Sequence, residues 1–368
     1  MPEILKQHTT SEFGKGKNRR LVNLRATSSA SSIALLLAAC GREDRPTNEV
    51  PLKDETTNIP TQNNDTLIGS DDIDAFTALA GDDTIKAFGG ADNIIAGPGN
   101  DTIEAGDGDD YIDPGSGNDF TYGGEGNDTI LLSPGIDLED GGPGIDTIIH
   151  APTQTSQALT IDLAQGMYYP THQLTAITRN LVSIENIESQ GSTDLTIIDT
   201  SGVNTITLSS GNDTVRSVGG NDIINTGAGN DTVYLGQGQY QVDLGAGDDT
   251  VYLTTTASSI EGNTGSDTVI VRQADGFVDV TIDLRHSTYD VPSKLTAQDG
   301  MDVPLNGFEN VTIDGNVQAT IYGSSVNEIL IGDRSSDVIT GGGGADTITG
   351  GARSDTFVFN SNDTGITE

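Results

Sequence analysis

The sequence predicts an all-β fold, a right-handed parallel β-roll or solenoid with two β-rich interruptions. Two observations lead to this prediction: a nine-residue repeat runs through most of the chain, and each repeat joins a glycine-rich hexapeptide to one large apolar residue. The hexapeptide favours a turn, because glycine adopts the positive φ angles that other residues resist. The residues that follow predict a short strand, which can bury its apolar side chain only against neighbouring repeats. We expect two consecutive repeats to make one coil, which stacks on the coils before and after it.

The composition excludes several classes of protein. With 55 acidic and 17 basic residues, the chain has a formal net charge of −38. It is therefore not expected to bind nucleic acid, and it should attract cations instead. Aromatic residues make up only 5% and tryptophan is absent, which excludes a large aromatic core. The single cysteine excludes a disulfide framework and a thiolate metal cluster, and no apolar stretch is long enough for a membrane-spanning helix.

The amino-terminal segment differs from the rest of the chain. It is basic and leads into a short apolar run that ends at Cys40. A basic region followed by apolar and then small residues is typical of a secretory signal peptide. The tetrad Leu37-Ala38-Ala39-Cys40 resembles the lipobox of bacterial lipoproteins. This resemblance implies cleavage before Cys40 and lipidation of Cys40. The polar residues that follow have no periodicity and predict a flexible tether.

The first block of repeats has an aspartate at position 6 of every nine-residue repeat. Position 4 is usually glycine and position 8 is usually apolar, and the repeat from Gly123 to Leu131 spells the motif G-G-x-G-x-D-x-U-x in full, where U is a large apolar residue. The position-6 residues of this block are Asp65, Asp74, Asp83, Asp92, Asp101, Asp110, Asp119, Asp128, Asp137 and Asp146.

Stacked coils would bring these carboxylates together beside the carbonyl oxygens of the glycine turns. Carboxylates stacked in this way repel one another unless a cation lies between them. Oxygen ligands in a flexible loop suit Ca²⁺ better than Mg²⁺. The motif resembles the calcium-binding nonapeptide of the repeats-in-toxin (RTX, hemolysin-type) family over roughly 300 residues. The resemblance implies a parallel β-roll that binds several Ca²⁺ ions.

Two spacers separate the blocks of repeats and resemble each other. Thr160-Ile161-Asp162-Leu163 matches the segment 281–284, and the segment 184–186 (Ile-Glu-Asn) matches 308–310 (Phe-Glu-Asn). Their alternating apolar residues predict strands. We expect each spacer to continue the solenoid with longer loops directed outward.

The second block predicts different chemistry on its two edges. One edge carries Asp213, Asp231, Asp249 and Asp267, whereas the opposite edge carries Asn204, Asp222, Tyr240 and Ser258. Only one residue of the second set is a carboxylate. We therefore expect calcium along the first edge, and hydrogen bonds and packing along the other.

A third, short block carries Asp337, Asp346 and Asp355, which are the remaining candidate calcium ligands. Arg353 replaces the position-4 glycine of its last repeat, which puts a site there in doubt. The end of this block, Asp355 to Phe359, resembles the strand that ends the repeats of serralysin-type proteases.

These features divide the chain into eight predicted segments. They are a signal peptide (1–39), a tether (40–59), the first β-roll block (60–149), a spacer (150–198), the second block (199–270), a second spacer (271–322), the third block (323–359) and a tail (360–368).

Known catalytic motifs are absent from the sequence. It contains no H-E-x-x-H, no G-x-S-x-G and no phosphate-binding glycine loop. His150, the first histidine after the segment 1–39, and the two that follow it each stand alone, as expected of surface residues rather than ligands. Tyr168, Tyr169 and His172 could form a sugar-contacting patch, or they could belong to an ordinary loop. We therefore predict that the protein is not an enzyme.

The predicted function is calcium binding by an exported, lipid-anchored protein at the outer membrane, on the cell surface or outside the cell. So acidic a chain with so thin a core should fold only when extracellular Ca²⁺ binds, and it would then act as a structural or adhesive module. Two alternatives stay open: the calcium-binding part of a secreted hydrolase or toxin whose catalytic domain lies elsewhere, and a module that binds acidic polysaccharide. The expected partners are calcium ions and cell-surface polysaccharide or matrix, with membrane contact only through the lipid anchor.

Overall fold

The computed structural model describes residues 59–151, 158–171, 179–253, 259–272, 279–288, 291–297 and 302–359. These residues belong to the second of two units, Asp54–Glu368. The first unit, Met1–Lys53, contains Cys40 and the predicted signal peptide and lies outside the described residues. All regular structure in the described ranges is β-strand, as the repeat predicts. Those ranges accordingly hold no helix of the length and apolar character that crossing a membrane requires.

The described strands form two 16-stranded sheets and one small two-stranded sheet. In order of pairing, the first sheet consists of β1 (Thr66–Ser70), β3 (Thr84–Gly89), β5 (Thr102–Asp107), β7 (Phe120–Glu125), β9 (Leu138–Asp140), β13 (Arg179–Val182), β12 (Met167–Pro170), β11 (Leu159–Asp162), β15 (Leu195–Ile198), β17 (Thr214–Arg216), β20 (Thr232–Tyr234), β23 (Thr250–Leu253), β25 (Asp267–Arg272), β29 (Phe308–Asp314), β31 (Ile329–Ile331) and β33 (Thr347–Thr349).

The second sheet consists of β2 (Ala75–Thr77), β4 (Asn93–Ile95), β6 (Tyr111–Asp113), β8 (Thr129–Leu131), β10 (Thr147–His150), β14 (Asn186–Ser189), β16 (Thr205–Thr207), β19 (Ile223–Asn225), β22 (Gln241–Asp243), β24 (Ser259–Glu261), β28 (Asp302–Asn306), β27 (Val291–Ala297), β26 (Asp279–Thr288), β30 (Gln318–Tyr322), β32 (Val338–Thr340) and β34 (Thr356–Val358). The small sheet pairs β18 (Gly219–Gly220) with β21 (Gln237–Gly238).

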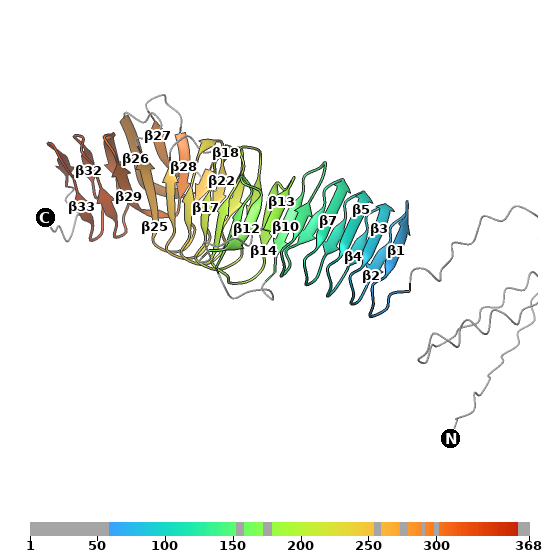
Figure 1. The fold of residues 1–368 in the computed structure, drawn as a ribbon. Helices are drawn as coiled ribbons and strands as arrows, with labels where there is room; N and C mark the ends of the chain where they lie inside the picture. The colour runs from blue at the N-terminus through green and yellow to red at the C-terminus, as the bar shows by residue number, and fades with distance from the viewer. Residues whose placement is uncertain are drawn as a thin grey trace, which may run out of the picture. The chain divides into compact units, whose positions relative to one another are not determined.

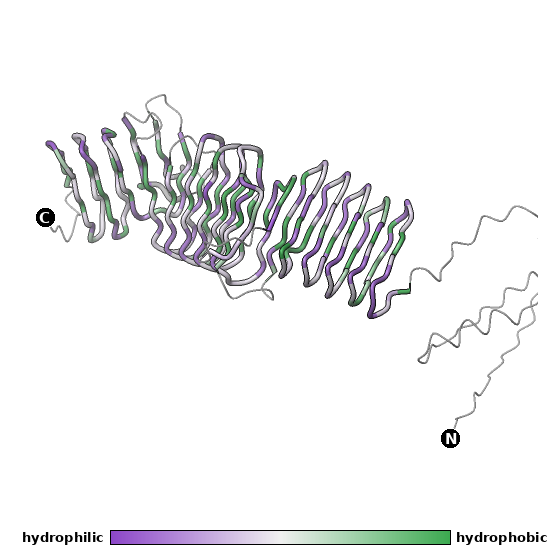
Figure 2. Tube along the Cα trace, viewed as in Figure 1, coloured by the Kyte–Doolittle hydropathy of each residue, from purple (hydrophilic) through white to green (hydrophobic). Residues whose placement is uncertain are grey.

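The repeat coils stack in parallel with a constant register. Leu67 of β1 pairs with Ile85 of β3, and Ile85 pairs with Ile103 of β5. Because each strand has its apolar residue at the same place, the side chains stack into one core between the two sheets. Ile85, Ile94 and Ile103 are all fully buried. The stacked coils are visible in Figure 1, and Figure 2 shows hydrophobic positions recurring from coil to coil. The blocks therefore form the parallel β-solenoid that the sequence predicts.

The two interruptions differ from the expected parallel coils with outward loops. In the first, β12 pairs antiparallel with both β11 and β13, so three strands enter the first sheet in place of one. In the second, β27 pairs antiparallel with β26 and β28 in the second sheet. The physical reason is that antiparallel neighbours need only a short connection, such as residues 163–166 between β11 and β12.

Candidate calcium-binding loops

The aspartates of the repeat form two ladders, one along each edge of the stacked coils. The backbone N–H of Asp83 donates to Oδ1 of Asp101 at 2.7 Å, and the N–H of Asp101 donates to Oδ1 of Asp119 at 2.8 Å. On the opposite edge, the N–H of Asp92 donates to Oδ1 of Asp110 at 2.7 Å. One carboxylate oxygen of each residue thus joins its coil to the coil before it.

The second oxygen of most of these carboxylates is buried without a hydrogen-bond partner in the described part of the chain. These side chains are no more than 3% exposed. A buried carboxylate oxygen without a partner is costly, and a bound cation would offset that cost. The residues concerned are Asp83, Asp92, Asp101, Asp110, Asp119, Asp128, Asp146, Asp213, Asp231, Asp249 and Asp267.

Backbone carbonyl oxygens line the space beside the free oxygens. A methyl group at Gly123 would collide with Oδ2 of Asp128 and would lie 2.6 Å from the carbonyl oxygen of Gly141, one coil later. At Gly117, where φ is 150°, a methyl group would collide with the carbonyl oxygen of Gly99. Glycine is needed here because loops of successive coils stack closely. Carboxylate and carbonyl oxygens are the ligands that Ca²⁺ takes in proteins, so these loops fit that ion.

The electrostatics of the ladders also favour a cation. Burial, together with the charge of the aspartate one coil earlier, raises the pKa of Asp101 and Asp110 to about 6. The same causes raise the pKa of Asp119 and Asp128 to about 7, although a backbone N–H on each carboxylate opposes the shift. Ionised ladders at neutral pH therefore need positive charge close by.

In some repeats the second carboxylate oxygen of the aspartate accepts a hydrogen bond from a hydroxyl group. The backbone N–H and hydroxyl of Thr61 donate to Oδ2 of Asp65 at 2.6 and 3.0 Å. Ser70 does the same for Asp74, at 2.6 and 2.9 Å. Both aspartates were predicted as calcium ligands, and the structure places protein donors on the oxygen that a metal would use.

The residue four positions before the aspartate accounts for this difference in the first block. Where it has a left-handed backbone, as at Leu79 (φ 85°), Phe88 (φ 78°) and Gly97 (φ 105°), the second oxygen of the following aspartate is free. Thr61 and Ser70 do not have that conformation, and their hydroxyl groups reach the carboxylate. The local backbone thus decides whether a loop stays open to a metal.

Asp137 is also capped, and Ser133 stands four positions before it, where the open loops of the first block have a residue with a left-handed backbone. Its Oδ2 accepts hydrogen bonds from the hydroxyl of Tyr168 at 3.1 Å and from Ser133 at 3.3 Å. Arg179 donates through Nε to the carbonyl oxygen of Gly135 in the same loop, and its guanidinium lies 5.0 Å from the centre of the Tyr168 ring. The first interruption therefore brings a positive charge and a hydroxyl group to this loop.

The same contacts exclude Tyr168 from the sugar-contacting patch that the sequence left open, and they place Tyr168 and Tyr169 on strand β12 rather than in a loop. Tyr168 is only 1% exposed, because its residue faces inward on β12 and its hydroxyl group is bonded to Asp137. His172 lies outside the described residues. His150 was expected at the surface but is 2% exposed, and burial lowers its pKa.

The two edges of the second block differ in the structure. Asp213, Asp231 and their two successors on that edge keep a free oxygen. On the opposite edge, Ser217 donates to Oδ2 of Asp222 at 2.9 Å and also contacts the hydroxyl of the buried Tyr240 at 3.2 Å.

The opposite edge also includes Asn204 and Ser258. Asn204 accepts a bond from Thr200 at 3.0 Å, and Ser258 lies outside the described residues. Hydrogen bonds are in place on the opposite edge. Calcium binding along the first edge alone stays a prediction.

The third block has fewer free oxygens than the first. Asp337 accepts bonds from Ser335 at 2.9 Å and from the N–H of Asp333 at 3.1 Å. Asp346 and Asp355 are partly exposed, and Asp355 accepts the N–H of Asp337 at 3.0 Å. Arg353, which replaces a glycine, has a left-handed φ of 73°. The backbone turn is thus kept without glycine.

Two glutamates join the ladders that the sequence assigned to aspartate alone. Oε2 of Glu185 accepts the N–H of Asp146 at 2.8 Å, and Oε2 of Glu309 accepts the N–H of Asp267 at 2.9 Å. The matching Ile-Glu-Asn and Phe-Glu-Asn segments of the spacers were the signal that could have identified them.

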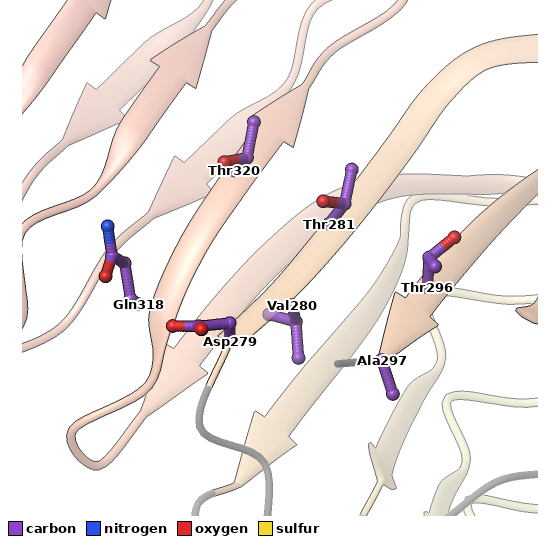
Figure 3. A pocket seen from close by; sticks show the side chains of 7 residues that line it. All are labelled: Asp279, Val280, Thr281, Thr296, Ala297, Gln318 and Thr320. Atoms are coloured by element: carbon purple, nitrogen blue, oxygen red, sulfur yellow. The ribbon is translucent and has the colours of Figure 1, made fainter. Parts of the chain in front are cut away.

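Within the described residues, the structure has no group of three or more histidine, cysteine, aspartate or glutamate side chains that could hold a metal ion. Any ion in the loops would therefore depend on backbone carbonyl oxygens as well as carboxylates. A separate surface depression of about 270 Å³ has only one carboxylate and is lined mainly by hydroxyl and amide groups (Figure 3). Its lining residues are Asp279, Val280, Thr281, Thr296, Ala297, Gln318 and Thr320.

Comparison with known protein families identifies the repeats. The RTX calcium-binding nonapeptide repeat matches residues 61–87, 87–121, 122–139, 196–223, 207–242, 243–275 and 322–357, which together cover more than half of the chain. The comparison with curated proteins found no match. The matches fall on the same three blocks whose loops carry the aspartate ladders. The chain therefore belongs to the family of proteins with RTX calcium-binding nonapeptide repeats, and calcium is the ion that these repeats bind.

Proposed function

We propose that this protein is an exported, lipid-anchored surface module that folds on binding extracellular calcium and serves a structural or adhesive role without catalysis. The observation that carries the proposal is the set of eleven buried oxygens of the ladder aspartates that lack a partner in the described residues. Their loops also supply carbonyl oxygens. The loops can therefore bind the ion only when they are folded, and the bound ion stabilises the folded loops.

Calcium would contribute much of the stability of this fold. Each occupied site stabilises the folded state by about 1.4 kcal/mol when free Ca²⁺ exceeds the dissociation constant tenfold. Extracellular calcium modules bind in the range of about 10⁻⁴–10⁻³ M. At lower concentrations the aspartates would repel one another, so the chain would stay unfolded until it reaches the outside of the cell.

A calcium titration followed by far-UV circular dichroism tests the folding proposal. We expect residues 41–368 to change from coil to β-structure between sub-millimolar and millimolar Ca²⁺, and Mg²⁺ at the same concentrations to have no such effect. A β spectrum that forms equally well in a calcium chelator would contradict calcium-coupled folding.

The lipid anchor has a separate test at Cys40. The family supports an extracellular location, and the segment ending at Cys40 supports lipidation. We expect palmitate label on the full chain in cells, and loss of both label and membrane association in Cys40→Ser. Ser32→Ala, in the same segment, is the control and should keep both. Label that persists in Cys40→Ser would exclude this anchor.

The adhesive role can be measured on cells that display the protein. We expect these cells to adhere to one another or to matrix in millimolar Ca²⁺ and to separate in a chelator. Cells that display Asp119→Asn should require more calcium, and cells that display Asp222→Asn should behave as the wild type does. Adhesion that does not depend on calcium or on displaying the protein would oppose the role.

One surface feature favours acidic polysaccharide as a second candidate partner. Tyr234 and Tyr252 stack with ring centres 4.4 Å apart, Arg216 lies 4.2 Å over the first ring, and Arg272 lies 4.2 Å over the second. Two guanidinium groups on one sheet face of so acidic a chain fit an anionic sugar chain. We expect Arg216→Gln to weaken binding to a uronic-acid polysaccharide, and Lys86→Gln to leave it unchanged. Equal binding by both variants would exclude this face.

A further inference from the structure

The two interruptions end in the same way, although they lie in different sheets. After the first, Glu185 accepts the backbone N–H of Asp146. After the second, Glu309 accepts the N–H of Asp267. In both cases a glutamate, 39 or 42 residues further along the chain, takes the place that the next aspartate holds in a regular coil. The ladder of carboxylates therefore continues across each interruption.

Each of these places also has a buried carboxylate oxygen without a partner. Asp146 and Asp267 are both 0% exposed, and Oδ2 of each has no hydrogen-bond partner in the described ranges. The nearby glutamate adds a second negative charge. The pair is thus unfavourable without a cation.

A carbonyl oxygen faces the same space in both places. A methyl group at Gly141 would collide with Oδ2 of Asp146 and with the carbonyl oxygen of Ser183. A methyl group at Gly262 would lie 2.7 Å from Oδ2 of Asp267 and 2.5 Å from the carbonyl oxygen of Gly307. The two sites therefore repeat the arrangement of a regular loop, with the aspartate and the glycine from a nonapeptide and the carbonyl group and the glutamate from outside the repeats.

The backbone conformation and the long glutamate side chain explain how a short loop brings a carboxylate to the N–H of the aspartate. Ser183 and Gly307 both have left-handed φ angles, 51° and 74°, two residues before the glutamate. For serine this conformation is uncommon, so the turn is held by its surroundings. Only residues 183–185 separate β13 from β14, and only Gly307 separates β28 from β29. In both places the glutamate side chain reaches the N–H of the aspartate.

We propose that each joint binds one Ca²⁺ ion between the last nonapeptide loop before an interruption and the segment that follows the interruption. The ligands at the first joint are Oδ2 of Asp146, the carbonyl oxygen of Ser183 and the carboxylate of Glu185. At the second joint the corresponding groups come from Asp267, Gly307 and Glu309. Each ion ties the last coil before an interruption to the strand that returns after it. The inference rests on the proposed calcium-dependent folding, because it uses the same ion.

The first test is a crystal structure of the calcium-loaded protein with anomalous difference maps. We expect a calcium peak between Asp146 and Ser183 and another between Asp267 and Gly307, in addition to peaks in the regular loops. Peaks in the regular loops without peaks at the joints would overturn this inference alone. The absence of calcium from every loop would overturn the proposed function itself.

Variants provide a second readout in solution. Glu185→Gln and Glu309→Gln keep an oxygen that can accept the N–H of the aspartate but lose the charge. We expect calorimetry to show one Ca²⁺ ion fewer in each variant. The matched control is Glu188→Gln, on the strand β14 that follows the first joint, where Glu188 accepts a hydrogen bond from the side chain of Gln190. Unchanged stoichiometry and affinity in both joint variants would contradict the proposal.

Discussion

The hydroxyl of Tyr168 donates a hydrogen bond to Oδ2 of Asp137 across 3.1 Å, whereas the same oxygen of Asp119, one coil earlier, has no partner in the described residues. Both aspartates occupy position 6 of the repeat. Arg179 adds a positive charge beside Asp137 and opposes the rise in its pKa that burial causes. The first interruption thus supplies protein groups at a place where a regular loop is suited to a cation.

We expect Tyr168→Phe to destabilise the protein. The change removes a donor and leaves a buried carboxylate oxygen with only the longer bond from Ser133. The expected loss is about 1–3 kcal/mol of the free energy of unfolding, measured by urea denaturation in saturating calcium. Tyr169→Phe, at the neighbouring and more exposed residue, is the control. Equal stability of the two variants would show that the bond to Asp137 contributes little.

We expect Asp231→Asn to weaken calcium-dependent folding much more than Asp222→Asn. Both asparagines would still accept a backbone N–H from the previous coil, as the aspartates do at 2.7 and 2.9 Å. Only Asp231 has a free second oxygen, because Ser217 already bonds that of Asp222. The calcium midpoint, followed by circular dichroism, should rise about tenfold for Asp231→Asn, equivalent to ~1.4 kcal/mol. Similar midpoints for both variants would oppose a one-edged second block.

Without calcium, we expect the folded state to be more stable near pH 5 than near pH 8. Burial raises the pKa of Asp119, Asp128 and Asp213 from 3.8 to about 7. Between these values the folded state holds more protons than the unfolded state. The free energy of unfolding therefore falls as pH rises from about 4 to about 7.

The measurement is the far-UV circular dichroism of the chain in a chelator across that pH range, and we expect more β-structure near pH 5 than near pH 8. In saturating calcium the trend should weaken or reverse, because protons compete with Ca²⁺ for the same carboxylates. Stability that increases from pH 5 to pH 8 in the chelator would contradict the assignment.

We expect Glu139→Leu to stabilise the protein. Glu139 is on β9 at a core position, is 0% exposed, and neither carboxylate oxygen has a partner in the described residues. Burial raises its pKa to about 8. Leucine would match Leu181, which pairs with this position on β13, with an expected gain of about 1–3 kcal/mol in thermal or urea unfolding. The exposed Glu104→Leu is the control and should change stability by less than about 0.5 kcal/mol. A loss of stability in Glu139→Leu would indicate that this carboxyl group has a role.

The sequence alone determined the period, the strands and the alignment of the ladders. Asp83, Asp101 and Asp119 align because the nine-residue spacing places one aspartate at the same point of every coil. The residue two positions later is usually apolar and then faces the core, although Thr121 and Glu139 are buried polar exceptions. Both results depend only on local spacing, which the sequence contains. The family resemblance followed from the same motif.

The sequence contains part of what decides which aspartates keep a free oxygen, because Ser133 stands before Asp137 where Gly115 stands before Asp119. Only the tertiary structure shows the donors from outside the repeat, such as Tyr168, which reaches Asp137 from 31 residues away. Glu185 reaches Asp146 from 39 residues away through an interruption whose antiparallel strands the repeat does not predict. The capping of a buried carboxylate depends on whichever donor packs against it, and the period places no constraint on residues outside the repeat. That is why the ladders could be predicted from the sequence, whereas their capped ends and their glutamate joints could not.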